Sequence, residues 1–325
     1  MTARRKIGCD WYTYLMVAAV ALLVLVSLHA MFSSPSTTVR VLAKLPSSAA
    51  WQPPIVLLVA LGLCIGCYGT IVGIGGGPLI LPLLVFFYGW GNEFLVATSL
   101  FIVLLNAASG SAGYAAQKRI DYAGGIKFSL AAMPGALISS FTHHLFNLSF
   151  FNIIFAVFLI LLAVFTISSV GKIDKTVAQR QKQLKDGVAH GFRRVLFTDR
   201  FRVAYDFYAN DRLGVTLNLL LGFFCGFLGI GGGVFQVPIL VFLLNYPMHL
   251  ATATSHFVTL LTCAVALLPH VFLGNVRYAE ALWMGVGVVL GAQAGARIAV
   301  KLNSKVMLYL FIVVLLVFAV RLFLA

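Results

Sequence analysis

The chain has 325 residues, of which 61% are apolar and only 10% are charged, with 23 Lys and Arg against 9 Asp and Glu. Soluble domains are about half apolar and about a quarter charged. Residues 51–117 hold one charged side chain, Glu93, and residues 213–276 hold none. These stretches exclude a soluble fold and predict an all-α polytopic membrane protein, because a spanning helix satisfies its own backbone polar groups in lipid.

The first apolar run, at 11–32, follows Arg4, Arg5 and Lys6. Its length of about 20 residues favours a retained helix over a cleaved signal peptide. The later apolar segments lie at 54–73, 78–90, 94–116, 122–145, 150–170, 213–229, 234–244, 250–273, 279–297 and 306–324. The expected parts are an N-terminal helix with its linker (1–50), a transmembrane repeat (51–170), a basic loop (171–212) and a second transmembrane repeat (213–325).

Two apolar segments, 79–88 and 234–244, are too short to cross a bilayer. At 1.5 Å per residue each rises only ~15–17 Å, which is about half of a ~30 Å hydrocarbon core. Each follows a longer segment across a glycine cluster, Gly73-Ile-Gly-Gly-Gly77 or Gly229-Ile-Gly-Gly-Gly233. This pattern predicts a helix, a glycine break and a half-helix that together turn back inside the membrane.

The two glycine clusters belong to an internal repeat. Residues 73–99 and 229–255 align without a gap at an offset of 156, and 12 of 27 positions are identical, including a proline and an Ala-Thr-Ser triplet. An odd number of crossings follows the first helical hairpin, so the two copies begin on opposite sides of the membrane. We therefore expect two inverted repeats, each with a glycine-broken helical hairpin plus three spanning helices, and one extra N-terminal helix.

Basic residues predict the orientation. With the N-terminus and the 171–212 loop in the cytoplasm and the C-terminus outside, 19 of the 23 Lys and Arg lie in or near the cytoplasm of a cell (inner) membrane, as cytoplasmic loops favour. Basic residues also bind nucleic acid, but no soluble basic module is present, so nucleic acid is not an expected partner. The basic loop is either a connector or a segment that lies on the inner leaflet.

Inverted repeats with interrupted helices are typical of secondary transporters. The half-helix after each cluster presents unpaired N–H groups and a positive dipole end, which suit an anion. Acidic residues are absent around both clusters, which disfavours a cation site. The alternative is that the clusters only let helices pack closely. The glycines expected to bind substrate are Gly75, Gly76, Gly77, Gly231, Gly232 and Gly233.

Polar side chains follow each half-helix. Hydroxyl and amide groups can donate hydrogen bonds to an oxyanion without adding a fixed charge. Ser and Thr in membrane helices also bond to their own backbone, which is the alternative. His256 either takes up a proton that couples to transport or makes a bond between helices. The side chains expected to bind substrate are Thr98, Ser99, Asn106, Gln236, Thr254, Ser255 and His256.

The sequence does not favour an enzyme. Ser255 and His256 are adjacent, but adjacent helical residues point about 100° apart and do not face each other. The spacing of Cys64 and Cys67 lies in a spanning segment and reads as packing. No catalytic residue, metal ligand or cofactor is expected.

The stretch G-I-G-G-G-P-L-I-L-P-L-L with its later A-T-S, and its copy G-I-G-G-G-V-F-Q-V-P-I-L with A-T-A-T-S, resemble the TauE/SafE family of sulfite and organosulfonate exporters. The resemblance covers about 51–170 and 213–325. It implies a transporter that exports small sulfur-containing anions such as sulfite or organosulfonates. The interrupted inverted repeats predict that it works by alternating access at the half-helices. An anion channel and a carrier of other small organic anions stay open as alternatives, as do proton coupling and the oligomeric state.

Overall fold

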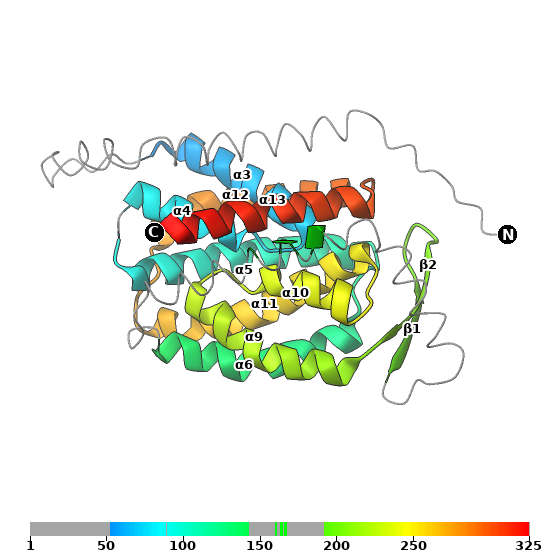
Figure 1. Ribbon diagram of the computed structural model, residues 1–325. Helices are drawn as coiled ribbons and strands as arrows, with labels where there is room; N and C mark the ends of the chain where they lie inside the picture. The colour runs from blue at the N-terminus through cyan, green and yellow to red at the C-terminus, as the bar shows by residue number, and fades with distance from the viewer. Residues whose placement is uncertain are drawn as a thin grey trace, which may run out of the picture.

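The structure is a computed structural model that describes residues 53–88, 90–142, five residues between 160 and 167, and 192–324 (Figure 1). The expected helix at 11–32, nearly all of that at 150–170, and residues 171–191 of the basic loop lie outside the described residues. The helices are α3 (Ile55–Val72), α4 (Gly77–Tyr88), α5 (Asn92–Ala116), α6 (Tyr122–Thr142), α9 (Asp211–Leu228), α10 (Gly233–Pro238), the π-helical turn η2 (Ile239–Leu243), α11 (Met248–Phe272), α12 (Tyr278–Ala299) and α13 (Ser304–Leu324).

Each apolar segment predicted within the described residues is helical, which confirms the helical membrane fold. Four of the described helices, α3, α5, α11 and α12, are long and apolar enough to cross a membrane. Across the described helices, large apolar side chains lie on the outer surface and polar side chains lie in the interior. Leu130 and Leu290 are more than half exposed on α6 and α12, whereas Asn106 and His256 on α5 and α11 are fully buried. An exposed apolar surface of this kind suits contact with lipid.

The helices recur at the offset of the sequence repeat. Adding 156 to the bounds of α3 gives 211–228, which are the bounds of α9, and adding it to those of α5 gives 248–272, the bounds of α11. Both α3 and α9 end at a glycine with left-handed backbone, Gly73 (φ 88°) and Gly229 (φ 65°). Glycine adopts this conformation without the steric cost of a Cβ.

The two half-helices differ in detail. The first, α4, is one α-helix of 12 residues with Pro82 inside it. The second has only six α-helical residues, ends at Pro238, and continues as the five-residue turn η2. At about 1.5 Å per residue neither reaches across a ~30 Å core, so their predicted shortness is confirmed.

Helices of one repeat pack on helices of the other repeat. Helix α3 packs on α12, while α9 packs on α6. A Cβ added to Gly66 would lie 2.4 Å from the carbonyl oxygen of Val288, and one added to Gly222 would lie 1.8 Å from that of Ala132. Both members of one contact are 156 residues from those of the other. Such reciprocal contacts are those of a two-fold arrangement.

The central helices α5 and α11 run antiparallel (Figure 1). The N–H of Asp121, just after α5, donates to Thr254 near the start of α11 over 3.2 Å. The N–H of Arg277, just after α11, donates to Thr98 near the start of α5 over the same distance. These two helices, which are repeat equivalents, therefore run in opposite directions.

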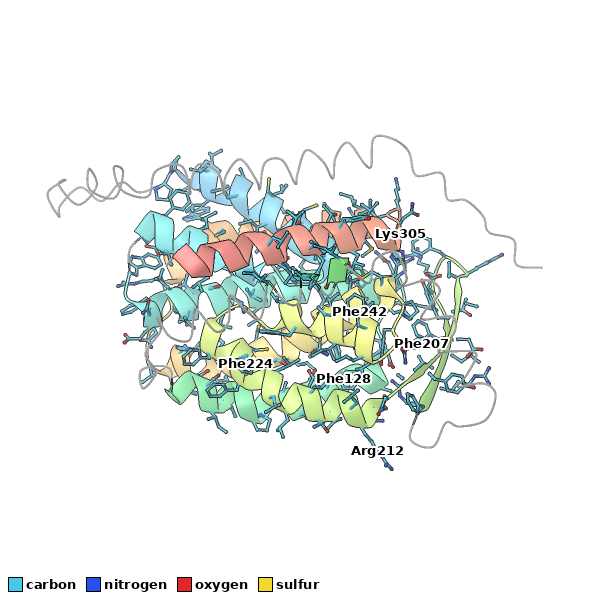
Figure 2. The ribbon with its side chains drawn as sticks, viewed as in Figure 1. Phe128, Phe207, Arg212, Phe224, Phe242 and Lys305 are labelled. Carbon is cyan, nitrogen blue, oxygen red and sulfur yellow. The ribbon has the colours of Figure 1, made fainter. Side chains whose placement is uncertain are left out.

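A β-hairpin covers one end of the helices. Its strands, β1 (Arg193–Thr198) and β2 (Ala204–Ala209), are antiparallel, with Arg193 opposite Ala209. Val195 and Phe207 are buried on its inner face, and Figure 2 shows Phe207 pointing toward the helices. The basic composition of 171–212 predicts a loop, but residues 193–209 of this segment fold as the β-hairpin.

Candidate functional site

The two glycine breaks meet in the middle of the molecule. Gly75 and Gly231 both have left-handed backbone, with φ of 72° and 76°. A Cβ on either glycine would meet the same two side chains, Val103 of α5 and Thr259 of α11, at distances between 2.5 and 3.3 Å. Positions 75 and 231, and positions 103 and 259, are repeat equivalents. The breaks therefore sit at the centre of the two-fold arrangement.

The backbones of the two breaks also touch. A Cβ on Gly77 would lie 2.1 Å from the carbonyl oxygen of Ile230, and one on Gly233 would lie 2.6 Å from Cα of Ile74. No side chain fits at these distances, so the first residue of each half-helix must be glycine for the breaks to come together. Close packing is one of the two predicted interpretations of the clusters, and these contacts support it.

Two serines brace the breaks across the repeats. Ser99 Oγ donates to the carbonyl oxygen of Gly229 over 2.9 Å, and Ser255 Oγ donates to that of Gly73 over 2.8 Å. Both serines are fully buried. Each hydroxyl thus holds the glycine that ends the helix of the other repeat.

The predicted threonines have partners in the protein backbone. Thr98 and Thr254 accept hydrogen bonds from Arg277 and Asp121 at opposite ends of the bundle. Thr262, the repeat equivalent of Asn106, donates to Val258 of its own helix. These hydroxyls therefore bond to the protein backbone.

Two buried amides have unused donors. Nδ2 of Asn106 and Nε2 of Gln236 have no hydrogen-bond partner among the described residues, although the two side chains are 0% and 2% exposed. Asn106 Nδ2 would lie 3.4 Å from a Cβ on Gly76, and Gln236 lies one helical turn after Gly232, whose carbonyl accepts from the Gln236 N–H. Buried N–H groups are rarely left unpaired, so each break carries a donor that a ligand can use.

His256 and Ser255 have different partners. Nε2 of His256 lies 3.2 Å from Oγ1 of Thr70 on α3, while Ser255 bonds to Gly73. The two side chains form no catalytic pair. Thr70 was missed by sequence analysis, because a lone threonine in an apolar helix has no distinguishing pattern.

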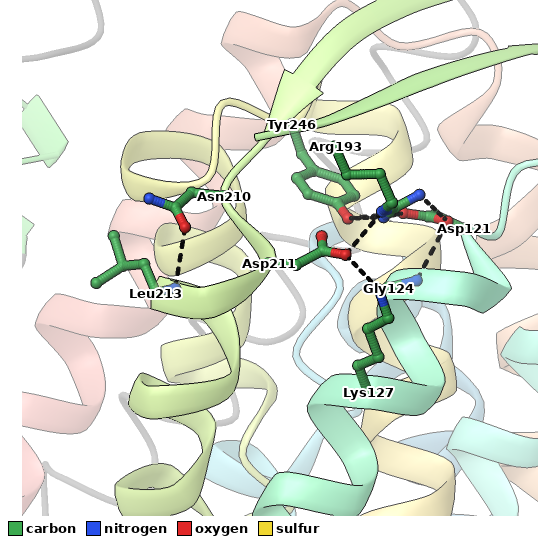
Figure 3. A network of polar contacts seen from close by, with 8 residues as sticks. All are labelled: Asp121, Gly124, Lys127, Arg193, Asn210, Asp211, Leu213 and Tyr246. Carbon is green, nitrogen blue, oxygen red and sulfur yellow. Dashed lines mark hydrogen bonds and ion pairs between the residues drawn. The ribbon is translucent and has the colours of Figure 1, made fainter. Parts of the chain in front are cut away.

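At the β-hairpin end, charged residues form a network (Figure 3). Arg193 of β1 bonds to Asp121, to Asp211 and to the hydroxyl of Tyr246, which itself donates to Asp121 over 2.7 Å. Partial burial opposes the charge of Arg193, but its hydrogen bonds to Asp121 and Asp211 outweigh this and raise its pKa. Burial, reinforced by Asp121, also raises the pKa of Tyr246.

A second contact fastens the turn of the β-hairpin. Arg119 pairs with Asp199 over 3.1 Å, and their side chains are only 4% and 0% exposed. The N–H of Arg200 donates to the carbonyl of Gln117. An open pocket of about 460 Å³ between the β-hairpin and the ends of α5 and α6 is lined in part by Lys118 and Arg194. At the opposite end, Arg277 lies over the rings of Trp90 and Phe94.

Comparison with known proteins agrees with these features. A family model described as sulfite exporter TauE/SafE matches residues 9–166 and 93–322. The chain is 29% identical over 274 residues to the probable membrane transporter protein YunE of Bacillus subtilis, covering 82% of this chain and 96% of that protein. It is 26% identical over 264 residues to the probable membrane transporter protein MJ0441 of Methanocaldococcus jannaschii, covering 77% and 88%.

No solved structure matches the chain. The family match nevertheless spans both glycine breaks and all of the described helices except the last residues of α13. With its apolar helices and paired breaks, the chain therefore belongs to the sulfite exporter TauE/SafE family of membrane transporters.

Proposed function

We propose that the chain is a secondary transporter that exports small sulfur-containing anions, sulfite or organosulfonates, by alternating access at the two glycine breaks. The observation that carries this proposal is the pair of unpartnered amide donors, Asn106 Nδ2 and Gln236 Nε2, buried beside the breaks. An oxyanion accepts hydrogen bonds and donates few, so it complements such donors. Residues 94–120 and 212–279 contain no acidic side chain that would repel it. The class of cargo comes from the family description.

We propose that the repeats are inverted in the cell membrane, with the N-terminus and the β-hairpin end in the cytoplasm and the C-terminus outside. The distribution of charge supports this orientation. Figure 2 shows Arg212 and Lys305 at the same end of the bundle as the β-hairpin, whereas Arg277 lies at the other end with Trp90 and Phe94. Lys and Arg are enriched on the cytoplasmic side of membrane proteins.

The test uses purified protein in liposomes loaded with labelled sulfite. We expect saturable release that the Gly76→Leu/Gly232→Leu double variant loses, because both glycines have left-handed backbone and crowded surroundings. Gly91→Leu is the matched control, since the nearest atom to an added Cβ there is 3.8 Å away and φ is −57°. Release equal to that of protein-free liposomes would overturn sulfite as cargo, and the same assay with sulfonates would then follow.

The same liposomes distinguish a carrier from an anion channel. A carrier returns faster when it is loaded, so sulfite outside the liposomes accelerates release of the label. An open pore shows no such acceleration. We expect acceleration, because the two breaks pack against each other and every residue of both clusters is buried. This packing does not suit an open pore at the breaks.

A further inference from the structure

Three buried side chains from three helices are joined beside the first break. Thr70 of α3 donates from Oγ1 to Oδ1 of Asn106 on α5 over 3.3 Å. Nε2 of His256 on α11 lies 3.2 Å from the same Thr70 oxygen. All three residues are 0% exposed. Thr70 thus links a titratable ring to the amide at the break.

The direction of these bonds follows from the number of protons. A threonine hydroxyl has one proton, and Thr70 uses it toward Asn106. Its oxygen must therefore accept from His256, which requires the proton of the neutral ring on Nε2. The other ring nitrogen, Nδ1, makes no hydrogen bond among the described residues, and the backbone of Thr252, one turn earlier on α11, is the other polar group recorded against the ring. A free acceptor is left at one end of the chain of bonds and a free donor, Asn106 Nδ2, at the other.

Neighbouring groups hold the ring in place. Tyr114 of α5 lies edge-on to His256 with a centroid distance of 5.7 Å, and its hydroxyl donates to the carbonyl of Thr70. A Cβ on Gly110 would lie 2.5 Å from the ring, so this glycine allows α5 to approach. Tyr114 is the titratable side chain that contacts the ring, and the contacts recorded from α3 and α5 otherwise come from Thr70 and Gly110. No carboxylate is recorded against it in the described part of the chain.

We infer that His256, Thr70 and Asn106 form a relay in which a proton on His256 Nδ1 and an oxyanion on Asn106 Nδ2 stabilise each other. This inference rests on the proposed binding of an anion at the break. A protonated ring is a stronger donor to Thr70, and hydrogen bonds in a chain polarise one another at low dielectric constant. Thr70 is a positioning residue, because it acts through Asn106. The only covalent change is the N–H bond that forms at Nδ1, with a proton that comes from water and returns to water on release.

The relay has two linked consequences. Anion affinity falls as pH rises through the titration of His256, and binding of the anion draws in a proton, because coupling between two sites is reciprocal. The anion would then cross the membrane with a proton. A merely structural contact between the helices predicts neither effect.

The experiment measures binding of methanesulfonate to the purified full-length protein in nanodiscs by calorimetry between about pH 4 and about pH 8, which brackets the range of histidine. A sulfonate keeps its charge across this range, whereas sulfite changes its own protonation. Buffers of different ionisation enthalpy report proton uptake. We expect affinity to fall about tenfold or more with rising pH, with uptake of up to one proton per anion.

Two variants separate the relay from simple packing. His256→Gln keeps an N–H donor but takes up no proton, so we expect binding that no longer depends on pH and no proton uptake. Thr70→Val removes the link and is expected to weaken binding and abolish its pH dependence, while Thr70→Ser restores both. Thr262→Val is the matched control, because this buried hydroxyl bonds to its own helix, and it should behave as the wild type.

The outcomes distinguish the two proposals. If neither methanesulfonate nor another small sulfonate binds the wild type, the proposed site at the breaks fails. If the anion binds with the same affinity at every pH and without proton uptake, or if His256→Gln keeps the wild-type pH profile, the relay is wrong and the transporter stands. His256→Gln decides the matter alone if Thr70→Val does not fold.

Discussion

The carboxylate of Asp199 lies 3.1 Å from Nε of Arg119, and both side chains are almost completely buried beneath the turn of the β-hairpin. The same carboxylate also accepts from the N–H groups of Phe201 and Val203. The Asp199 carboxylate therefore has two roles: it stabilises the turn, and it holds the turn against the end of α5.

Removing one member of this buried pair should release the turn. Arg119→Met leaves Asp199 without its cation, and breaking a buried ion pair costs about 3–5 kcal/mol. We expect trypsin to cut faster at Arg200 and Arg202, measured by gel or mass spectrometry on the purified protein. Arg194→Met is the control, because Arg194 pairs with Asp206 on the exposed face, and its rate of cutting should match the wild type. Equal rates in all three proteins would contradict the fastening role.

Alkaline pH should weaken the same region. Burial raises the pKa of Tyr205 to about 12, with a smaller lowering by Arg119 and a smaller raising by Asp199, whereas an exposed tyrosine titrates near about 10. Between these values the folded chain keeps a proton that the unfolded chain loses, so stability falls as pH rises. Below about pH 10 both states are protonated and the contribution is constant.

The check is the loss of thermal stability between about pH 9 and about pH 11 in the wild type and in Tyr205→Phe. Other groups titrate in both proteins, so their difference isolates Tyr205. We expect the variant to lose less. A loss as large as in the wild type would show that Tyr205 does not contribute.

The serine braces should be energetically equivalent. Ser99→Ala and Ser255→Ala each remove one hydrogen bond and leave the carbonyl of Gly229 or Gly73 without its donor. Each should cost about 1 kcal/mol, seen as similar decreases in melting temperature in detergent. Thr262→Val should cost less, because its carbonyl partner lies in its own helix. If the two serine variants lower the melting temperature by very different amounts, the two hydrogen bonds do not contribute equally to stability.

Crowding at the breaks predicts the effect of a single methyl group. Gly77→Ala places its Cβ 2.1 Å from the carbonyl oxygen of Ile230, so the two breaks must move apart. Overpacking usually costs about 1–3 kcal/mol, and here we also expect sulfite release from liposomes to be lost. Gly91→Ala, which meets nothing closer than 3.8 Å, should keep both stability and release. Full activity in Gly77→Ala would contradict close contact of the breaks during transport.

The helices were predictable because length, hydropathy and glycine position are local properties of the sequence. The bounds expected for the segment at 94–116 differ from those of α5 by only two residues. The β-hairpin was not predictable in the same way. Its first strand, Arg-Arg-Val-Leu-Phe-Thr, is short and lies among basic residues. The alternating burial in Ala204–Ala209 is visible only once the hairpin is packed on the helices.

The candidate site was predictable in its glycines and buried amides but not in its connections. Asn106 and His256 were expected near the breaks, and each is fully buried there. Their link through Thr70 joins positions 36 and 186 residues apart, which no local pattern indicates. The cross-repeat bonds of Ser99 and Ser255 were missed for the same reason, since the carbonyl acceptors belong to the backbone of the opposite repeat.

The exchange of packing partners between the repeats has a consequence for how the protein is made. Helix α3 is complete early in synthesis, but its partner α12 is the second-to-last described helix, and α6 likewise waits for α9. The first half therefore enters the bilayer with its glycine-lined faces uncovered and matures only when the second half arrives. Neither repeat contains the helix on which its own first described helix packs, so one repeat alone would leave this glycine-lined face uncovered.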